Sequence, residues 1–195
     1  MSGASDPLIL AFGDSLVAGY GLPRGDAFPA QLQRRLRATW PAAEVLDAGV
    51  SGDTTAGGLR RLPAVLSRLT RRPDLAIVEL GANDVLQRVA PARTRANLDA
   101  ILAELGRCGI PVLLAAVEPP AFLHAHASAY LAIYGELAAK HGVRTCPFFP
   151  DGVLGHPTMV LFDRVHPNAR AITRVVDAML PVILELLPRS QSAAA

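Results

Sequence analysis

Short apolar runs recur along the chain at intervals that fit one strand followed by one helix. They cover residues 8–12, 45–46, 75–80, 110–117 and 143–145. Their centres, at Leu10, Val45, Ile77, Leu113 and Val143, are separated by 35, 32, 36 and 30 residues. This is the length of a strand, a crossover helix and two loops. The runs are continuous rather than alternating, which is typical of strands that are covered on both faces.

Helical periodicity fills the intervals between these runs. Apolar residues recur every three or four positions in 28–36, in 98–105 and in 168–187, so each segment is predicted to bury one helical face. Pro181 is expected to kink the last helix. Pro63 is expected to split the second helical region, because the residue before a proline avoids the helical conformation. Residues 190–195 are expected to form a frayed tail.

The alternation of strands and helices predicts an α/β fold with a parallel five-stranded sheet. A chain of 195 residues fits one domain, with a core over about residues 8–188. Ligands of such a sheet bind in the crevice beyond the carboxyl ends of the strands. Candidate chemistry is therefore sought in the segments that follow each strand.

Composition and charge exclude several classes of protein. The chain is 51% apolar and 18% charged, which argues against disorder. A net charge of +2, from 19 basic and 17 acidic residues, gives no indication of a nucleic-acid partner. The two cysteines, Cys108 and Cys146, are too few for a disulfide framework or a structural zinc site.

The sequence predicts a soluble protein without an integral membrane segment. Residues 1–6 lack the charged start and apolar stretch of a signal peptide. The longest apolar runs, such as 112–117 and 179–183, are far shorter than the ~20 residues of a membrane span. As written, the chain is expected to be cytoplasmic, or periplasmic or secreted if its natural precursor loses a signal peptide. The sequence does not indicate an oligomeric state.

Polar clusters follow four of the predicted strands, at residues 13–16, 49–54, 81–84 and 163–168, and the first three contain glycine. Ser15 lies where a strand turns into a helix, so its hydroxyl is expected at the positive end of a helix dipole. Asp163 and His166 are three residues apart in a turn, a spacing that brings a carboxylate to one ring nitrogen and leaves the other free as a base. These types of residue are what acyl transfer requires.

Acyl transfer also needs donors for the oxyanion. The backbone N–H groups of Ser15 and Gly52 and the side-chain amide of Asn83 are the candidates. Glycine at position 52 permits close approach of the backbone, and asparagine supplies a neutral donor. Asp14 and Asp53 are interpreted as acceptors that organise the loops rather than as acid or base groups.

These clusters resemble the four sequence blocks of the SGNH hydrolases, also called GDSL lipases. The matching residues are Gly13-Asp14-Ser15-Leu16, Gly52, Gly81-x-Asn83-Asp84 and Asp163-x-x-His166. The stretches 51–54 and 78–84 are most similar to the bacterial acyl-CoA thioesterase, lysophospholipase and arylesterase subgroup. One departure is Asp47, where many members have asparagine at a position that is not catalytic.

The resemblance implies a flavodoxin-like three-layer α/β/α fold and a single hydrolase domain over residues 1–195. It also implies Ser15 as nucleophile, His166 as base, Asp163 as the residue that orients His166, and an oxyanion hole formed by Ser15, Gly52 and Asn83. No metal or organic cofactor is implied. The expected reaction is hydrolysis of a small-molecule acyl ester or thioester, such as an acyl-CoA or a lysophospholipid, through an acyl-enzyme intermediate.

Other interpretations remain open at this point. The same machinery would serve a carbohydrate-ester deacetylase, and a non-catalytic flavodoxin-like binding module is a further alternative. His124-x-His126, in a predicted loop, lacks a clear third ligand for a metal site. Apolar residues in two loops either contact an acyl chain or pack on the core; the candidates for substrate contact are Phe122, Leu123, Leu161 and Phe162.

Overall fold

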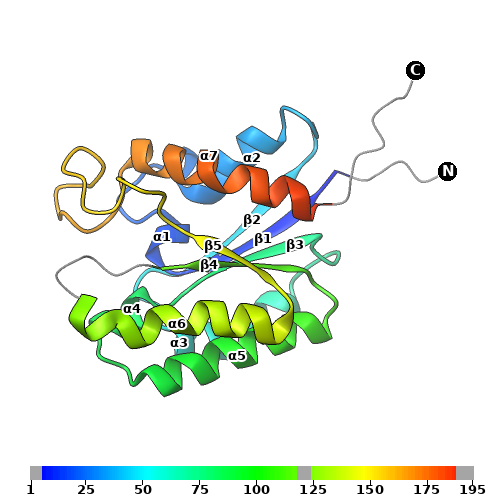
Figure 1. Cartoon of the computed structure of the whole chain (residues 1–195). Coiled ribbons are helices and arrows are strands. Elements are labelled where there is room, and N and C mark those ends of the chain that lie inside the picture. The colour runs from blue at the N-terminus through cyan, green and yellow to red at the C-terminus, as the bar shows by residue number, and fades with distance from the viewer. Residues whose placement is uncertain (1–5, 118–123, 188–195) are drawn as a thin grey trace.

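Five parallel strands form the centre of the fold (Figure 1). The computed structural model describes residues 6–117 and 124–187. The strands lie in the order β2-β1-β3-β4-β5. Their bounds are β1 Leu8–Gly13, β2 Glu44–Gly49, β3 Leu75–Glu79, β4 Val112–Ala116 and β5 Arg144–Pro147. Each strand overlaps one of the five apolar runs, so the predicted parallel α/β fold is confirmed.

Helices cover both faces of the sheet (Figure 1). Helices α2 and α7 pack on each other on one face, and α5 packs between α3 and α6 on the other. The three-layer α/β/α arrangement is therefore confirmed. The helix bounds are α1 Ser15–Ala18, η1 Arg24–Asp26, α2 Phe28–Leu36, α3 Thr55–Leu66, α4 Ala82–Leu86, α5 Pro91–Arg107, α6 His124–His141 and α7 Ala169–Leu186.

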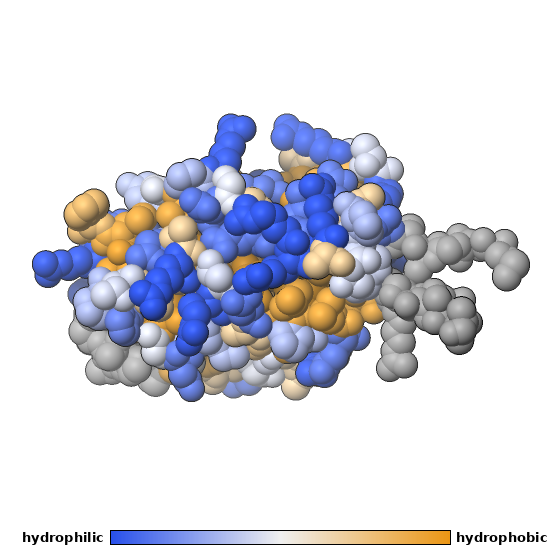
Figure 2. Space-filling model, turned by 90° about the horizontal axis from the view of Figure 1, so that it is seen from above, coloured by the Kyte–Doolittle hydropathy of each residue, from blue (hydrophilic) through white to orange (hydrophobic). Residues whose placement is uncertain are grey.

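The core lies on both sides of the central strands. All residues of β1 and β3 are buried, as the continuous apolar runs predict. Helix α7 turns Ile172, Val175 and Met179 toward the core. The outer surface over α2 and α7 is mostly hydrophilic, with smaller hydrophobic areas between the charged side chains (Figure 2). Each outer helix therefore buries one face, which its 3.6-residue period dictates.

Pro63 does not split the second helical region, so that prediction was wrong. Helix α3 continues from Thr55 to Leu66 with Pro63 inside it. The Thr54 side chain caps the first turn by accepting a hydrogen bond from the Gly57 N–H, and the helix ends three residues after the proline. Burial of Leu62 against the core stabilises the helical turn that contains Pro63. Helix α7 contains Pro181 in its interior, and the kink expected at that proline stays a prediction.

The strand order places a topological switch point at β1. The chain leaves β1 toward β2 on one side, and β3 pairs with β1 on the other. Open α/β sheets bind their ligands at such a point, beyond the carboxyl ends of the strands. The segments after β1, β2 and β3 therefore meet at one edge. Within 6–117 and 124–187, no helix is long and apolar enough to cross a membrane.

Candidate active site

Ser15 is the first residue of α1 and is separated from the carboxyl end of β1 by Asp14 alone. Gly13 is in register with Gly49 of β2 and Glu79 of β3. A Cβ atom on Gly13 would lie 2.4 Å from Val17 Cγ2 and 2.6 Å from the Glu79 carbonyl oxygen, so only glycine permits this turn. Helix α1 has only four residues, so its dipole at Ser15 is smaller than the strand-to-helix pattern of the sequence suggests.

Asp163, His166 and Ser15 form a continuous hydrogen-bonded line. His166 Nε2 is 3.1 Å from Ser15 Oγ, and His166 Nδ1 is 2.6 Å from Asp163 Oδ2. The turn that carries this pair is closed at its base, because the Leu161 N–H donates to the His166 carbonyl at 2.8 Å. The structure therefore brings together three residues from segments 151 positions apart in the chain.

The Asp163 carboxylate is held ionised by its own turn. Its Oδ1 accepts hydrogen bonds from the backbone N–H groups of Val165, at 2.9 Å, and His166, at 3.0 Å. These bonds, led by the one from Val165, together with the bond to His166 Nδ1, lower the pKa of Asp163 to about 2. Any stability that they supply is present above the unfolded pKa, near 4, and is lost only as the pH falls toward 2.

Tyr20 is a neighbour of the histidine that the sequence reasoning missed. Its ring lies over the His166 imidazole, with centroids 4.3 Å apart and planes tilted by 35°. Tyr20 is about half exposed, so one side of the imidazole is covered by an accessible aromatic ring. Its signal in the sequence was weak: one aromatic residue five positions after Ser15 in a glycine-bearing loop.

The three predicted oxyanion donors lie at the same sheet edge but in different states. Within the described part of the chain, the N–H groups of Ser15 and Gly52 donate no hydrogen bond, and Gly52 adopts a φ of 80°. The Asn83 amide is already engaged: Nδ2 is 2.9 Å from both Asp14 Oδ2 and the Asp53 carbonyl oxygen. For Asn83 to serve an oxyanion, one of these bonds has to be shared or exchanged when substrate binds.

Asp14 and Asp53 organise the loops, in line with their interpretation from the sequence. Asp14 Oδ1 accepts from the Leu16 N–H at 3.0 Å and so caps α1. Asp53 is paired with Arg61 at 2.6 Å. The Arg61 guanidinium also donates to the carbonyl oxygens of Gly13 and Ala48, which ties the first two loops together. Sequence reasoning missed Arg61, because nothing in its local sequence separates it from the other arginines.

The four apolar residues predicted to contact substrate differ in whether the structure describes them and in how exposed they are. Phe122 and Leu123 lie outside the described residues. Phe162 is fully exposed, whereas Leu161 is half-buried, with Cδ1 close to Gly21. Other apolar residues of that loop, Val153 and Met159 among them, pack in the core.

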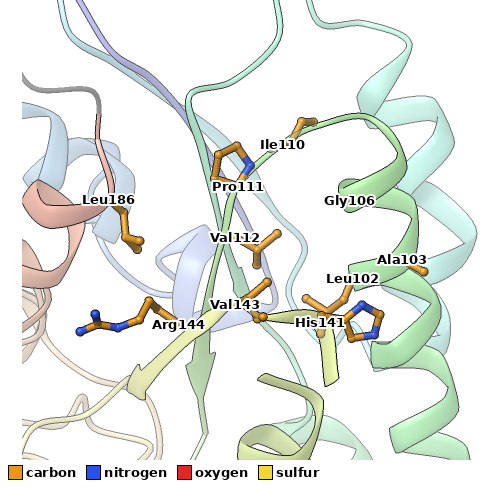
Figure 3. Close-up of a pocket in the computed structure, with 11 residues that line it drawn as sticks. Leu102, Ala103, Gly106, Ile110, Pro111, Val112, His141, Val143, Arg144 and Leu186 are labelled. Atoms are coloured by element: carbon orange, nitrogen blue, oxygen red, sulfur yellow. The ribbon is translucent and has the colours of Figure 1, made fainter. Parts of the chain in front are cut away.

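A separate hollow of about 390 Å³ lies at the opposite edge of the sheet, near the starts of β4 and β5 (Figure 3). Val112, Val143, Arg144 and His141 contribute to its lining. It is far along the strands from the carboxyl edge that carries Ser15, so it is not part of this site. The ionisable groups at its rim already have partners, His141 with Asp99 at 2.6 Å and Arg144 with Glu185 at 3.4 Å.

His124 and His126 lie in the first turn of α6 rather than in a loop, which corrects their predicted placement. Across 6–117 and 124–187, no group of three or more His, Cys, Asp or Glu residues is arranged to hold a metal ion. Asp47, the departure from the family pattern, is exposed and accepts a hydrogen bond from the Gly49 N–H at 2.9 Å.

A doubly wound parallel sheet with serine, histidine and aspartate in hydrogen-bonding line at its carboxyl edge is the architecture of a serine-type hydrolase. The chain belongs to the GDSL-like lipase/acylhydrolase family, whose model matches residues 11–171. The family resemblance drawn from the four sequence blocks is thereby confirmed.

Characterised relatives share most of the chain's length. It is 36% identical over 185 residues to esterase TesA of Pseudomonas aeruginosa, covering 94% of this chain and 91% of the relative. Thioesterase 1/protease 1/lysophospholipase L1 of Escherichia coli is 36% identical over 177 residues, which is 90% of this chain and 82% of that protein. The crystal structure of AlinE4, an SGNH-hydrolase family esterase, is 43% identical, with a TM-score of 0.77 over 96% of this chain and all of that chain.

The chain is therefore an enzyme of the class that hydrolyses carboxylic esters and thioesters. These relatives do not favour the two alternatives raised from the sequence, a carbohydrate-ester deacetylase and a non-catalytic flavodoxin-like binding module.

Proposed function

We propose that hydrolysis proceeds in two acyl-transfer steps through Ser15. His166 Nε2 takes the proton from Ser15 Oγ as the oxygen attacks the substrate carbonyl. The proton then passes to the leaving alcohol or thiol as its bond to the acyl carbon breaks. Water, activated by the same imidazole, attacks the acyl-serine and releases the carboxylic acid. The observation that carries this proposal is the 3.1 Å contact between Ser15 Oγ and His166 Nε2.

Asp163 is proposed to fix the tautomer and orientation of His166. Its Oδ2 accepts the Nδ1–H hydrogen bond, which leaves Nε2 without a proton and directed at Ser15. Because Asp163 remains ionised down to a pH of about 2, it also stabilises the imidazolium that forms during each step.

The backbone N–H groups of Ser15 and Gly52, together with the Asn83 amide, are proposed to stabilise the oxyanion. Ser15 follows β1, Gly52 follows β2 and Asn83 follows β3, so the three approach from adjacent loops. Donors of this kind act where negative charge develops, and each contributes more in the transition state than in the ground state.

The proposed substrates are small-molecule acyl esters or thioesters, of which acyl-CoA and lysophospholipid are members. The names of the relatives support this class, since they include an esterase, a thioesterase and a lysophospholipase. Half-buried Leu161 and exposed Phe162, next to the catalytic turn, are the described apolar residues proposed to meet the acyl chain; Phe122 and Leu123 remain predictions. A single hydrolase domain is proposed over residues 1–195, with its core over about residues 8–188.

A serine-directed phosphonate tests the proposal directly. We expect it to inactivate the enzyme and to add the mass of one phosphonyl group to the peptide that contains Ser15, measured by mass spectrometry after proteolysis. Label on a different residue, or inactivation without label, would contradict the assignment of Ser15. A series of p-nitrophenyl esters of increasing acyl length then separates this function from a deacetylase, which would lose activity steeply beyond acetate.

Replacement of Asn83 by alanine is expected to lower kcat by about 10²- to 10³-fold, the usual cost of removing one oxyanion donor. The KM should change much less, because the lost bond is made mainly in the transition state. Steady-state kinetics on a p-nitrophenyl ester measure both. Asn97→Ala is a matched control, because the Asn97 amide donates to Thr55 Oγ1. It is not part of the hydrogen-bonded line of Asp163, His166 and Ser15, which we call the catalytic line. Equal losses in the two variants would argue against the role of Asn83.

A further inference from the structure

Two buried carboxyl groups lie directly behind the Ser15 loop and take no part in the catalytic line. Glu79 is the last residue of β3 and Asp14 precedes Ser15; neither side chain is exposed. The Asp14 N–H donates to Glu79 Oε2 at 3.3 Å, and a Cβ on Gly13 would lie 2.8 Å from the same oxygen. The Glu79 carboxyl is therefore packed against the backbone that leads into the nucleophile.

The pair has no basic partner within the described residues. The nearby cation, Arg61, forms a salt bridge with Asp53 and donates its other hydrogen bonds to the backbone carbonyls of Ala48 and Gly13. Two adjacent carboxylates without a cation cannot both be ionised in a buried site at moderate cost. Burial raises the pKa of Asp14 to about 6, and burial together with the charge of Asp14 raises the pKa of Glu79 well above its ordinary range. Around neutral pH the pair therefore holds one proton.

Hydrogen bonds decide which carboxyl carries that proton. Asp14 accepts two bonds, from the Leu16 N–H and from Asn83 Nδ2, and both favour its ionised form. Glu79 accepts only the Asp14 N–H, and its Oε1 has no partner in the part of the chain described. If Glu79 rather than Asp14 is neutral, the remaining negative charge lies on the carboxylate with more hydrogen-bond donors. The proton therefore resides on Glu79 and is shared toward Asp14.

We propose that Glu79 is a positioning residue for the acyl-transfer reaction, acting as a buried neutral acid that donates to Asp14. The bond holds the Asp14 carboxylate where it fixes two groups at once: the turn that presents Ser15, through the Leu16 N–H, and the amide of Asn83. This inference rests on the proposed roles of Ser15 and Asn83. Glu79 contacts neither the substrate nor the reacting atoms.

Loss of the shared proton would remove this bond and place a second negative charge behind the oxyanion. The other titratable groups around the pair are His166 on the catalytic turn, Tyr134 on α6, Asp84 on α4, and Asp53 with Arg61. The Tyr134 hydroxyl donates to the Leu80 carbonyl, and its pKa is raised by burial, so it supplies no charge. Asp84 accepts its bonds from Thr55 and Thr94. None of these groups replaces the shared proton. We therefore expect kcat to fall at alkaline pH, where that proton is lost.

The pair also makes the stability of the fold depend on pH, in a direction opposite to that of Asp163. Because the folded pKa values are raised above the unfolded ones, the folded state binds more protons. The contribution of the pair to stability is therefore complete below about pH 4 and decreases as the pH rises through 6 and above. This gives a readout that does not depend on catalysis.

Three variants test the proposal, with the kcat profile measured from pH 6 to 10 on a p-nitrophenyl ester. Glu79→Gln keeps a donor to Asp14 without a titrating proton, so we expect kcat at pH 7 within about threefold of the parent and a smaller alkaline decline. Glu79→Leu has no donor and is expected to lower kcat by about 10- to 100-fold with little change in KM. Asp14→Asn cannot accept both of its bonds and is expected to lose at least as much.

Glu185→Gln, in an exposed pair at the end of α7, is the matched control and should keep the parent profile. The proposal is overturned if Glu79→Gln retains the parent's full alkaline decline, or if folded Glu79→Leu retains parent kcat. Should Glu79→Leu fail to fold, the thermal midpoint decides: it should fall less between pH 5 and 9 in Glu79→Gln than in the parent. Phosphonate labelling of Ser15 in each variant shows separately whether the proposed function holds.

Discussion

Replacement of Ser15 by alanine is expected to abolish nearly all ester hydrolysis, with a fall in kcat on the order of 10⁶-fold. The variant loses the oxygen that forms the acyl-enzyme, so no other group on the catalytic line can replace it. The His166–Asp163 pair and the oxyanion donors would remain, and they support at most a small residual rate. The KM or binding constant for a substrate analogue should change little, because the missing hydroxyl contributes little to binding.

The measurement is kcat on a p-nitrophenyl ester, with the thermal midpoint as a check on folding. Ser67→Ala is a suitable control. Ser67 lies just after the end of α3, and its hydroxyl donates to the Ala64 carbonyl within that helix. A folded Ser15→Ala variant with full activity would overturn the assignment of the nucleophile. It would leave the family membership untouched and direct attention to another residue of the same sheet edge.

Replacement of Asp163 by asparagine is expected to lower kcat by about 10⁴-fold while leaving the fold intact. An asparagine amide would donate to Nδ1, which stabilises the tautomer with the proton on Nε2. That nitrogen is 3.1 Å from Ser15 Oγ and could then no longer accept its proton. The exposure of Asp163 does not weaken this argument, because the effect depends on which nitrogen carries the proton rather than on burial.

The pH profile of the parent enzyme gives a further check on the role of Asp163. Since the pKa of Asp163 is about 2, the parent enzyme should show no titration of this carboxyl between pH 4 and 9. Asp177→Asn, which removes an exposed ion pair with Arg35 between α7 and α2, should keep parent kinetics. If Asp163→Asn retained more than a tenth of the parent kcat, orientation by Asp163 would not be needed for the reaction.

Local sequence was sufficient to predict the sheet and its functional edge. The runs that became β1, β3 and β4 are buried almost throughout, as expected for central strands covered on both faces, whereas the two edge strands β2 and β5 are more exposed. The final helix was predictable from the periodic spacing of Ile172, Val175 and Met179. Pro63 was the exception: burial of its neighbour Leu62 outweighed the local preference against helix.

The candidate site was predictable in its members but not in its internal bonds. Ser15 could be named because it comes just after β1, and Asp163 and His166 because they lie between the last strand and the final helix. The ends of parallel strands meet at one edge. The engagement of the Asn83 amide with Asp14 and with the Asp53 carbonyl could not be foreseen. Hydrogen bonds between loops depend on distances of a few tenths of an ångström, and no periodicity encodes them.

The sequence by itself determined the class of fold, and it indicated the edge of the sheet and the residues at which the proposed reaction takes place. It did so because periodicity and turn composition are local properties. Only the tertiary structure decided that Tyr20 covers the His166 ring, that Arg61 joins two loops and that Glu79 and Asp14 meet without a cation. Those features depend on contacts between distant segments, and the ionisation of a carboxyl is set by what surrounds it in space rather than along the chain.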